Sequence, residues 1–139
     1  MKPEIFHYDR LIKSEDLNHH GTLFAGRCAE WFVEAGFIAV ASVLPAANIV
    51  CLKVHGMTFS RPMRPGEIAR FSSRVVLVGR TSLTVYVSLA TRATTLPAVS
   101  GFITFVHVDK QGQSKPHGLS LDLETDEEIA LHQQALGLN

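Results

Sequence analysis

The chain has 139 residues, of which 46% are hydrophobic and 19% charged, and its 13 basic and 13 acidic residues balance. This length and composition suit one globular domain, residues 1–139, that buries a core without disulfides or a metal. A net charge of zero argues against nucleic-acid binding through general electrostatics. No window is apolar enough to span a membrane, and the amino terminus lacks the apolar core of a signal peptide. Cys28 and Cys51 stand alone in apolar runs, which favours buried, reduced thiols in a cytoplasmic protein.

The first third of the chain predicts a strand, a loop and a long helix. Residues 4–11 alternate weakly and indicate a short strand, and residues 14–21 are rich in loop-forming Ser, Asp, Asn and Gly. From Thr22 to Ser42 there is no Pro, and small or apolar residues recur mostly every three or four positions, which predicts one mostly buried helix. Gly21 and Gly26 bracket its start, where first-turn N–H groups suit a carbonyl oxygen or an anion.

The remainder predicts a sheet and a short terminal helix. Breaks rich in Pro and Gly separate four apolar runs, which indicates hairpins and an antiparallel sheet. A capping box at residues 125–128 starts a helix in a tail that spans about residues 122–139. We therefore expect an α+β domain with a long central helix wrapped by roughly five antiparallel strands, and pairing of one edge or face with a second copy. The four strands are predicted at residues 49–60, 66–78, 82–94 and 98–108.

Charge is unevenly distributed in spite of the overall balance. Between Lys53 and Arg92 there are seven basic residues and one acid, Glu67. These basic residues are either solvated positions on strand faces or part of a site for a phosphorylated small molecule. Residues 122–128 contain five acids and no base, which suits the start of the terminal helix through its dipole.

Four motifs follow one another between residues 2 and 116. They are Asn18-x-x-Gly21-x-x-Phe24-Ala25-Gly26, Trp31-Phe32-Val33-Glu34-Ala35-Gly36, Val54-His55-Gly56-Met57-x-Phe59-x-Arg61-Pro62-x-x-x-Gly66 and Gly79-Arg80-Thr81-Ser82. This series resembles the hotdog-fold acyl-CoA thioesterases, in particular the YciA and brain acyl-CoA hydrolase type. The resemblance implies hydrolysis of an acyl-CoA to a carboxylate and free CoA, without a metal or any cofactor besides the CoA of the substrate. It also implies an active site at the interface of a homodimer, and dimers that often assemble further into tetramers or hexamers.

The resemblance also implies roles for individual residues. The N–H near Gly26 would polarise the thioester carbonyl as an oxyanion hole does, and Asn18 would orient the water or the carbonyl. Basic side chains suit the phosphates of CoA. The residues expected to contact the substrate or its CoA part are Phe24, His55, Arg61, Arg80 and Ser82.

One position departs from the family. The residue fifteen positions after Asn18 is usually an acid, and here it is Val33, with Glu34 next. One helical step turns a side chain by about 100°. Three interpretations of Glu34 remain. It is the working carboxylate displaced by one position, or it is a structural or interface acid. In the third interpretation the base is another residue, such as Glu30 or a histidine. We take the first as the working hypothesis. The adjacent His19 and His20 would position water or cap backbone groups.

Two other functions follow from the same residues. A protein that lost the acid at position 33 would bind acyl-CoA or an acyl carrier without turnover. An enoyl-CoA hydratase carries Asp-x-Asn-x-x-His, of which Asp16-Leu17-Asn18 supplies the first half, but Gly21 stands where the histidine belongs. This mismatch disfavours the hydratase.

Overall fold

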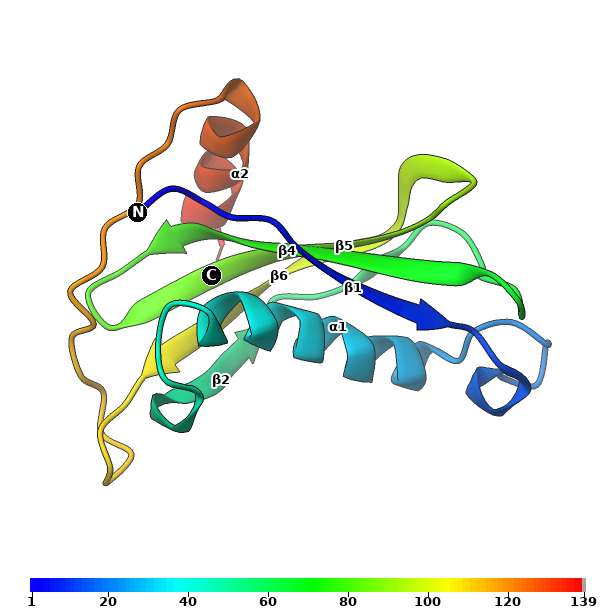
Figure 1. The fold of residues 1–139 in the computed structure, drawn as a ribbon, viewed down its shortest axis with the longest axis horizontal. Helices are drawn as coiled ribbons and strands as arrows, with labels where there is room; N and C mark the ends of the chain where they lie inside the picture. Colours follow the sequence, from blue (N-terminus) through cyan, green and yellow to red (C-terminus); the bar gives the residue numbers. More distant parts are fainter. Residues whose placement is uncertain (139) are drawn as a thin grey trace.

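The structure, a computed structural model, describes residues 1–138 with the exception of the side chain of Thr95. It shows a long helix on the inner face of a curled sheet and a short helix on the outer face (Figure 1). Two short 3-10 turns, η1 and η2, flank the long helix along the chain. The elements are β1 (Phe6–Leu11), η1 (Ser14–Asp16), α1 (Ala25–Ala41), η2 (Ala46–Asn48), β2 (Ile49–Val54), β3 (Thr58–Phe59), β4 (Ile68–Val78), β5 (Ser82–Thr91), β6 (Thr94–His107) and α2 (Asp126–Leu136).

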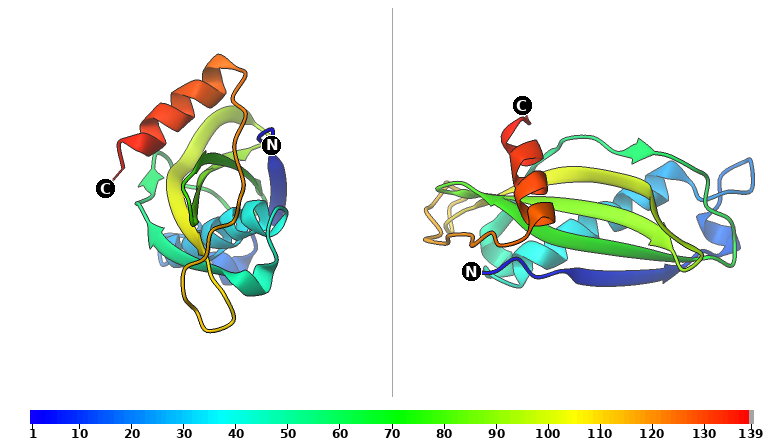
Figure 2. Two further views of the ribbon diagram at one scale, coloured as in Figure 1. Left: turned by 90° about the vertical axis from the view of Figure 1, so that its left-hand side faces the viewer. Right: turned by 90° about the horizontal axis from the view of Figure 1, so that it is seen from above.

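The strands form one antiparallel sheet in the order β1-β4-β5-β6-β2, with β3 paired to β6 beside this path. Seen end-on, the sheet curls over α1, so that β1 and β2 are its two edges (Figure 2). The expected α+β architecture, with hairpins after the central helix, is confirmed.

Two predicted boundaries in the sheet are wrong. The predicted strand 49–60 is divided into β2 and β3, because Gly56 adopts a φ of 123° that interrupts the extended chain. The predicted break at residues 95–97 lies inside β6. Thr91 pairs with Thr94, so the hairpin turn is formed by Arg92 and Ala93 instead.

One face of α1 and the inner face of the sheet form the core. Large buried side chains from the two layers include Trp31 and Phe32 of α1, Phe71 of β4 and Phe105 of β6. Gly101 of β6 lies so close to Gly56 and Phe32 that an added Cβ would overlap the carbonyl oxygen of Gly56. The small residue therefore lets the chain between β2 and β3 approach the sheet.

Helix α2 covers part of the outer face. Leu131 and Ala135 pack with Val76 of β4, and Arg74 contacts Glu127 at 2.7 Å. The predicted capping box is confirmed, because the Thr125 side chain accepts the N–H of Glu128 at 3.1 Å. Among the described residues, no helix is long and apolar enough to cross a membrane.

Candidate active site

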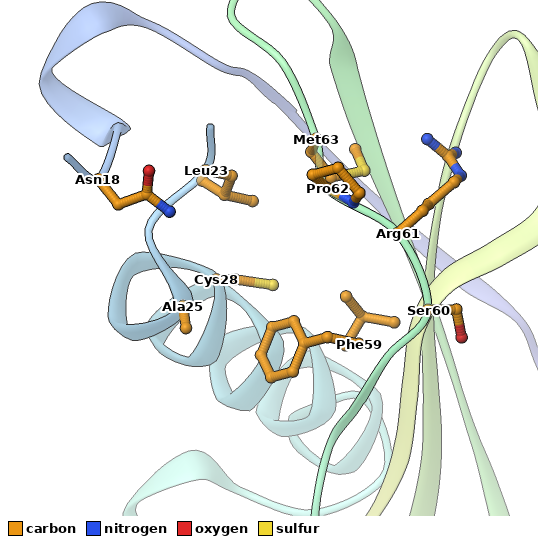
Figure 3. Close-up of a pocket in the computed structure, with 10 residues that line it drawn as sticks. Asn18, Leu23, Ala25, Cys28, Phe59, Ser60, Arg61, Pro62 and Met63 are labelled. Carbon is orange, nitrogen blue, oxygen red and sulfur yellow. The ribbon is translucent and has the colours of Figure 1, made fainter. Parts of the chain in front are cut away.

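A cavity of about 370 Å³ opens beside the first turns of α1. Its walls come from the loop before α1, from α1 itself and from the segment that follows β3. Leu23, Cys28 and Phe59 lie around one space, whereas the side chains of Ser60 and Arg61 point away from it (Figure 3). A concave space with mostly apolar walls and a few polar groups is typical of a small-molecule site. The apolar lining is Leu23, Ala25, Cys28, Phe59, Pro62, Met63 and Val99, and the polar lining is Asn18, Ser60 and Arg61.

Asn18 both lines this cavity and organises its own loop. Its Oδ1 accepts the backbone N–H groups of His20 at 2.8 Å and Thr22 at 3.2 Å. Its Nδ2 donates to the hydroxyl of Thr22 at 3.1 Å, which uses one of the two amide hydrogens. Asn18 is thus held in a fixed orientation at the mouth of the cavity. The backbone of His20, rather than its ring, takes part in this arrangement.

The first turn of α1 presents backbone donors. Phe24 is the N-cap residue and provides no side-chain hydrogen bond, and the first N–H with a backbone acceptor is that of Cys28, bonded to Phe24 O at 3.0 Å. Within the described residues, the N–H groups of Ala25, Gly26 and Arg27 have no partner. A side chain at position 26 would overlap the Phe24 ring. The helix start therefore combines free donors with a positive dipole end.

A second hollow of about 340 Å³ borders the same turn. It is lined by Phe24 and Gly26, which the sequence predicted as site residues, together with the carboxylates of Glu15, Asp16 and Glu30. The start of α1 consequently lies between two concave surfaces, one with Asn18 and one with Gly26.

Glu34 lies apart from both hollows. Its exposed carboxylate accepts a hydrogen bond from the Tyr8 hydroxyl at 3.1 Å, and that hydroxyl accepts one from Arg10 at 3.0 Å. Burial and the bond to Glu34 raise the pKa of Tyr8 above its ordinary value. Glu34 therefore faces the β1 edge, whereas Val33, one helical step away, is half-buried against the core.

The predicted CoA-binding residues are not all together in one chain. Arg61 reaches Thr91 at the end of β5 through a 3.2 Å contact from Nη2 to Oγ1, and its buried Nε has no partner in the described part of the chain. Arg80 and Ser82 lie at the opposite end of the sheet, beside the turn between β4 and β5 (Figure 1). The ten residues of β5 separate the two ends by about 30 Å. Within one chain these groups therefore lie at opposite ends of the sheet.

His55 also lies outside the cavity. Its Nε2 is 2.7 Å from the Thr104 hydroxyl, which in turn contacts the Thr84 hydroxyl at 2.9 Å. It lines a different hollow, on the outer face of the sheet beside Phe102 and the end of α2. Within one chain, His55 and Asn18 therefore belong to different hollows.

Sequence reasoning did not identify two features of this region. Cys28 forms part of the cavity wall, and burial raises the pKa of its thiol to about 12, so the neutral thiol adds to the apolar lining. Arg27 Nε contacts the buried Asp16 Oδ1 at 3.2 Å. The helical spacing indicated that Cys28 faces the core, but no local pattern in the sequence predicts the ion pair between Asp16 and Arg27.

Comparisons with known proteins identify the relatives of this chain. The family profile described as "Thioesterase superfamily" matches residues 20–98. The protein named "uncharacterized acyl-CoA thioester hydrolase YkhA" of Bacillus subtilis is 30% identical over 126 residues, 87% of this chain and 72% of the relative. Acyl-CoA thioester hydrolase YciA of Escherichia coli is 26% identical over 122 residues, 81% of this chain and 88% of YciA. A solved structure described as an apo-hexameric acyl-CoA thioesterase superposes with a TM-score of 0.86 at 25% identity, over 95% of this chain and 86% of that one.

Proposed function

This chain belongs to the thioesterase superfamily, and on that premise we propose how its residues act on an acyl-CoA. It is a hotdog-fold acyl-CoA hydrolase, which adds water to the thioester carbonyl and releases a carboxylate and free CoA. The observation that carries this function is the family match over residues 20–98, which includes most of the cavity wall and the whole of α1. We treat residues 1–139 as one such domain.

We propose that the thioester lies at the start of α1. The N–H of Gly26 would then donate to the carbonyl oxygen, which gains negative charge in the transition state, and the positive end of the helix would favour that charge. Asn18 would orient the attacking water or the carbonyl with its remaining amide hydrogen. The apolar cavity beside these groups suits the acyl chain. The free donors of the first turn and the fixed orientation of Asn18 support this assignment.

Two carboxylates are candidates for the base. Glu34 is the residue that the sequence favours, and its bond to Tyr8 on the β1 edge equally suits a structural acid. Glu30 lies one helical turn nearer the start of α1 and shares a hollow with Gly26. Because a general base contributes roughly a hundredfold or more, replacing the working one by Gln reduces turnover by at least about tenfold. The variants Glu34→Gln and Glu30→Gln keep side-chain shape and separate the two roles.

We further propose that the working unit is a homodimer formed through the β2 edge, with tetramers or hexamers as higher assemblies. Strand β2 pairs only with β6 among the described strands, and it exposes Val50 at 47%, Leu52 at 66% and Val54 at 42%. An edge strand with unpaired backbone and apolar side chains is suited to pairing with another strand. Replacing Leu52 by Lys should reduce the molecular mass measured by light scattering, whereas an unchanged mass would exclude this edge.

The experiment that tests the function is thiol release from a panel of short, long and aromatic acyl-CoAs. Turnover by the parent is expected, with a loss in one of the two Gln variants. Binding of CoA esters without turnover would replace hydrolysis by a binding role. Loss of enoyl-CoA absorbance would indicate a hydratase. The hydratase is disfavoured by the sequence, because Gly21 stands where the hydratase motif has a histidine.

We place the reaction in the cytoplasm. Both cysteines are free. Cys28 is buried as expected, but the expected burial of Cys51 is wrong, because Cys51 lies on the exposed edge strand β2. Exposed free thiols persist in reducing compartments, which supports this location.

A further inference from the structure

Asp16 is a charged side chain that is almost fully buried, with 3% of its surface exposed. Its Oδ2 accepts the backbone N–H of Lys13 at 2.9 Å, and its Oδ1 contacts Arg27 Nε at 3.2 Å. Its backbone oxygen accepts the N–H of Phe24 at 2.9 Å. A buried carboxylate is costly unless it is paired and hydrogen-bonded, and these contacts provide the compensation.

These contacts connect the two halves of the proposed site. Asp16 lies two residues before Asn18, and Arg27 is the third residue of α1, directly after Gly26. The ion pair therefore fixes the distance between the loop that orients Asn18 and the turn that carries the free N–H groups. Catalytic groups tolerate little displacement, since an error of about 1 Å can cost roughly a hundredfold in rate.

The pair also balances charge at the start of the helix. The negative charge of Asp16 lies beside the turn where the proposed reaction develops an oxyanion, and like charges repel strongly where water is largely excluded. Arg27 neutralises that charge. The second partner of Arg27 is Glu30, whose carboxylate lies 3.6 Å from Nη1 and is largely exposed, so Arg27 faces two acids.

We propose that Asp16 and Arg27 are positioning residues that hold the Asn18 loop against the first turn of α1 and cancel a buried charge beside the oxyanion. This inference rests on the proposed function. It assigns a role to the Asp-x-Asn sequence that otherwise resembles a hydratase motif. The carboxylate acts through Arg27 and the loop, and it does not touch the substrate.

The test compares Arg27→Gln, Asp16→Asn, the double variant and Arg27→Lys by kcat, KM and melting temperature. Arg27→Gln leaves the Asp16 charge uncompensated, and kcat should fall by about tenfold or more with a smaller change in KM. The double variant removes both charges and should recover part of kcat, and Arg27→Lys should recover more. The matched control is Arg70→Gln, which breaks an ion pair with Asp9 on β1 and β4, away from the cavity.

Two results would overturn the inference. An unchanged kcat in Arg27→Gln would show that the pair does not position the site. A double variant no more active than Arg27→Gln would show that charge balance is unimportant, and that Arg27 acts through Glu30 or through stability alone. If the parent itself shows no turnover, the proposed function fails separately. The nuclear magnetic resonance signals of the Asn18 side-chain amide still decide the positioning role, because they should shift in Arg27→Gln.

Discussion

Gly101→Ala is expected to destabilise the fold strongly. Gly101 lies on the inner face of β6, where an added methyl group would overlap the carbonyl oxygen of Gly56 and come within 3.1 Å of the Phe32 ring. The first neighbour is backbone, so relief requires the segment between β2 and β3 to move. Overpacking of a well-filled core costs about 1–3 kcal/mol, and a rigid neighbour favours the upper end. In a chain of this size that loss lowers the melting temperature by roughly 5–10 °C.

The measurement is thermal unfolding followed by circular dichroism at fixed protein concentration, because the proposed dimerisation would make the melting temperature depend on concentration. The matched control is Gly137→Ala, where the nearest atom to the new methyl group is Gln134 O at 3.5 Å, an ordinary contact. This control should melt at or slightly above the parent temperature. If Gly101→Ala has the same melting temperature as the parent, the close approach of β6 to the segment between β2 and β3 does not constrain position 101.

Two further predictions concern titrating groups. The Cys28 thiol is buried and its pKa is raised to about 12. It should therefore resist alkylation by iodoacetamide in the native protein and react after denaturation. Mass spectrometry of the peptides measures the labelling, and labelling of Cys28 in the native protein would contradict this prediction. Arg70 lowers the pKa of Asp9 in the folded protein. The exposed pair of Asp9 and Arg70 therefore stabilises the fold at any pH above the ordinary pKa of a carboxyl group. This stabilisation is lost as the pH falls through the lowered pKa of Asp9. The melting temperature of Arg70→Gln should therefore approach that of the parent in acid. A difference in melting temperature that does not change with pH would refute this prediction.

The long helix was predictable because its buried face repeats at helical spacing over many residues. It begins at Ala25, three residues after the predicted start at Thr22. The reason is tertiary, since Leu23 N donates to Met63 O at 2.8 Å and Leu23 forms a bridge with Leu17. The predicted strand 49–60 was wrong for a local reason, because Gly56 interrupts the extended chain. Pro97 is tolerated within β6, although in the sequence it indicated a break.

The candidate site was only partly predictable. Asn18, Gly26 and Phe24 lie where the motifs indicated, at the start of α1, because they are close together in the sequence and local structure determines their positions. Arg80 lies in the turn between β4 and β5 and Ser82 begins β5, at the other end of the sheet from the start of α1. The order of the motifs in the sequence does not reveal this separation. The Glu34 carboxylate accepts a hydrogen bond from Tyr8, a partner 26 positions away, and such long-range contacts leave no signal in a single sequence.

The order of the strands has a consequence for how the chain is made. Helix α1 precedes β4, β5 and β6 in the chain, yet these strands cover its apolar face. During synthesis the helix therefore emerges before its cover, and residues such as Trp31 and Phe32 remain accessible until the hairpins of β4, β5 and β6 have formed. Pairing of β1 with β4 must span some sixty residues, and such distant contacts slow folding. The ribosome-bound chain is therefore expected to be a substrate for chaperones that bind exposed apolar segments.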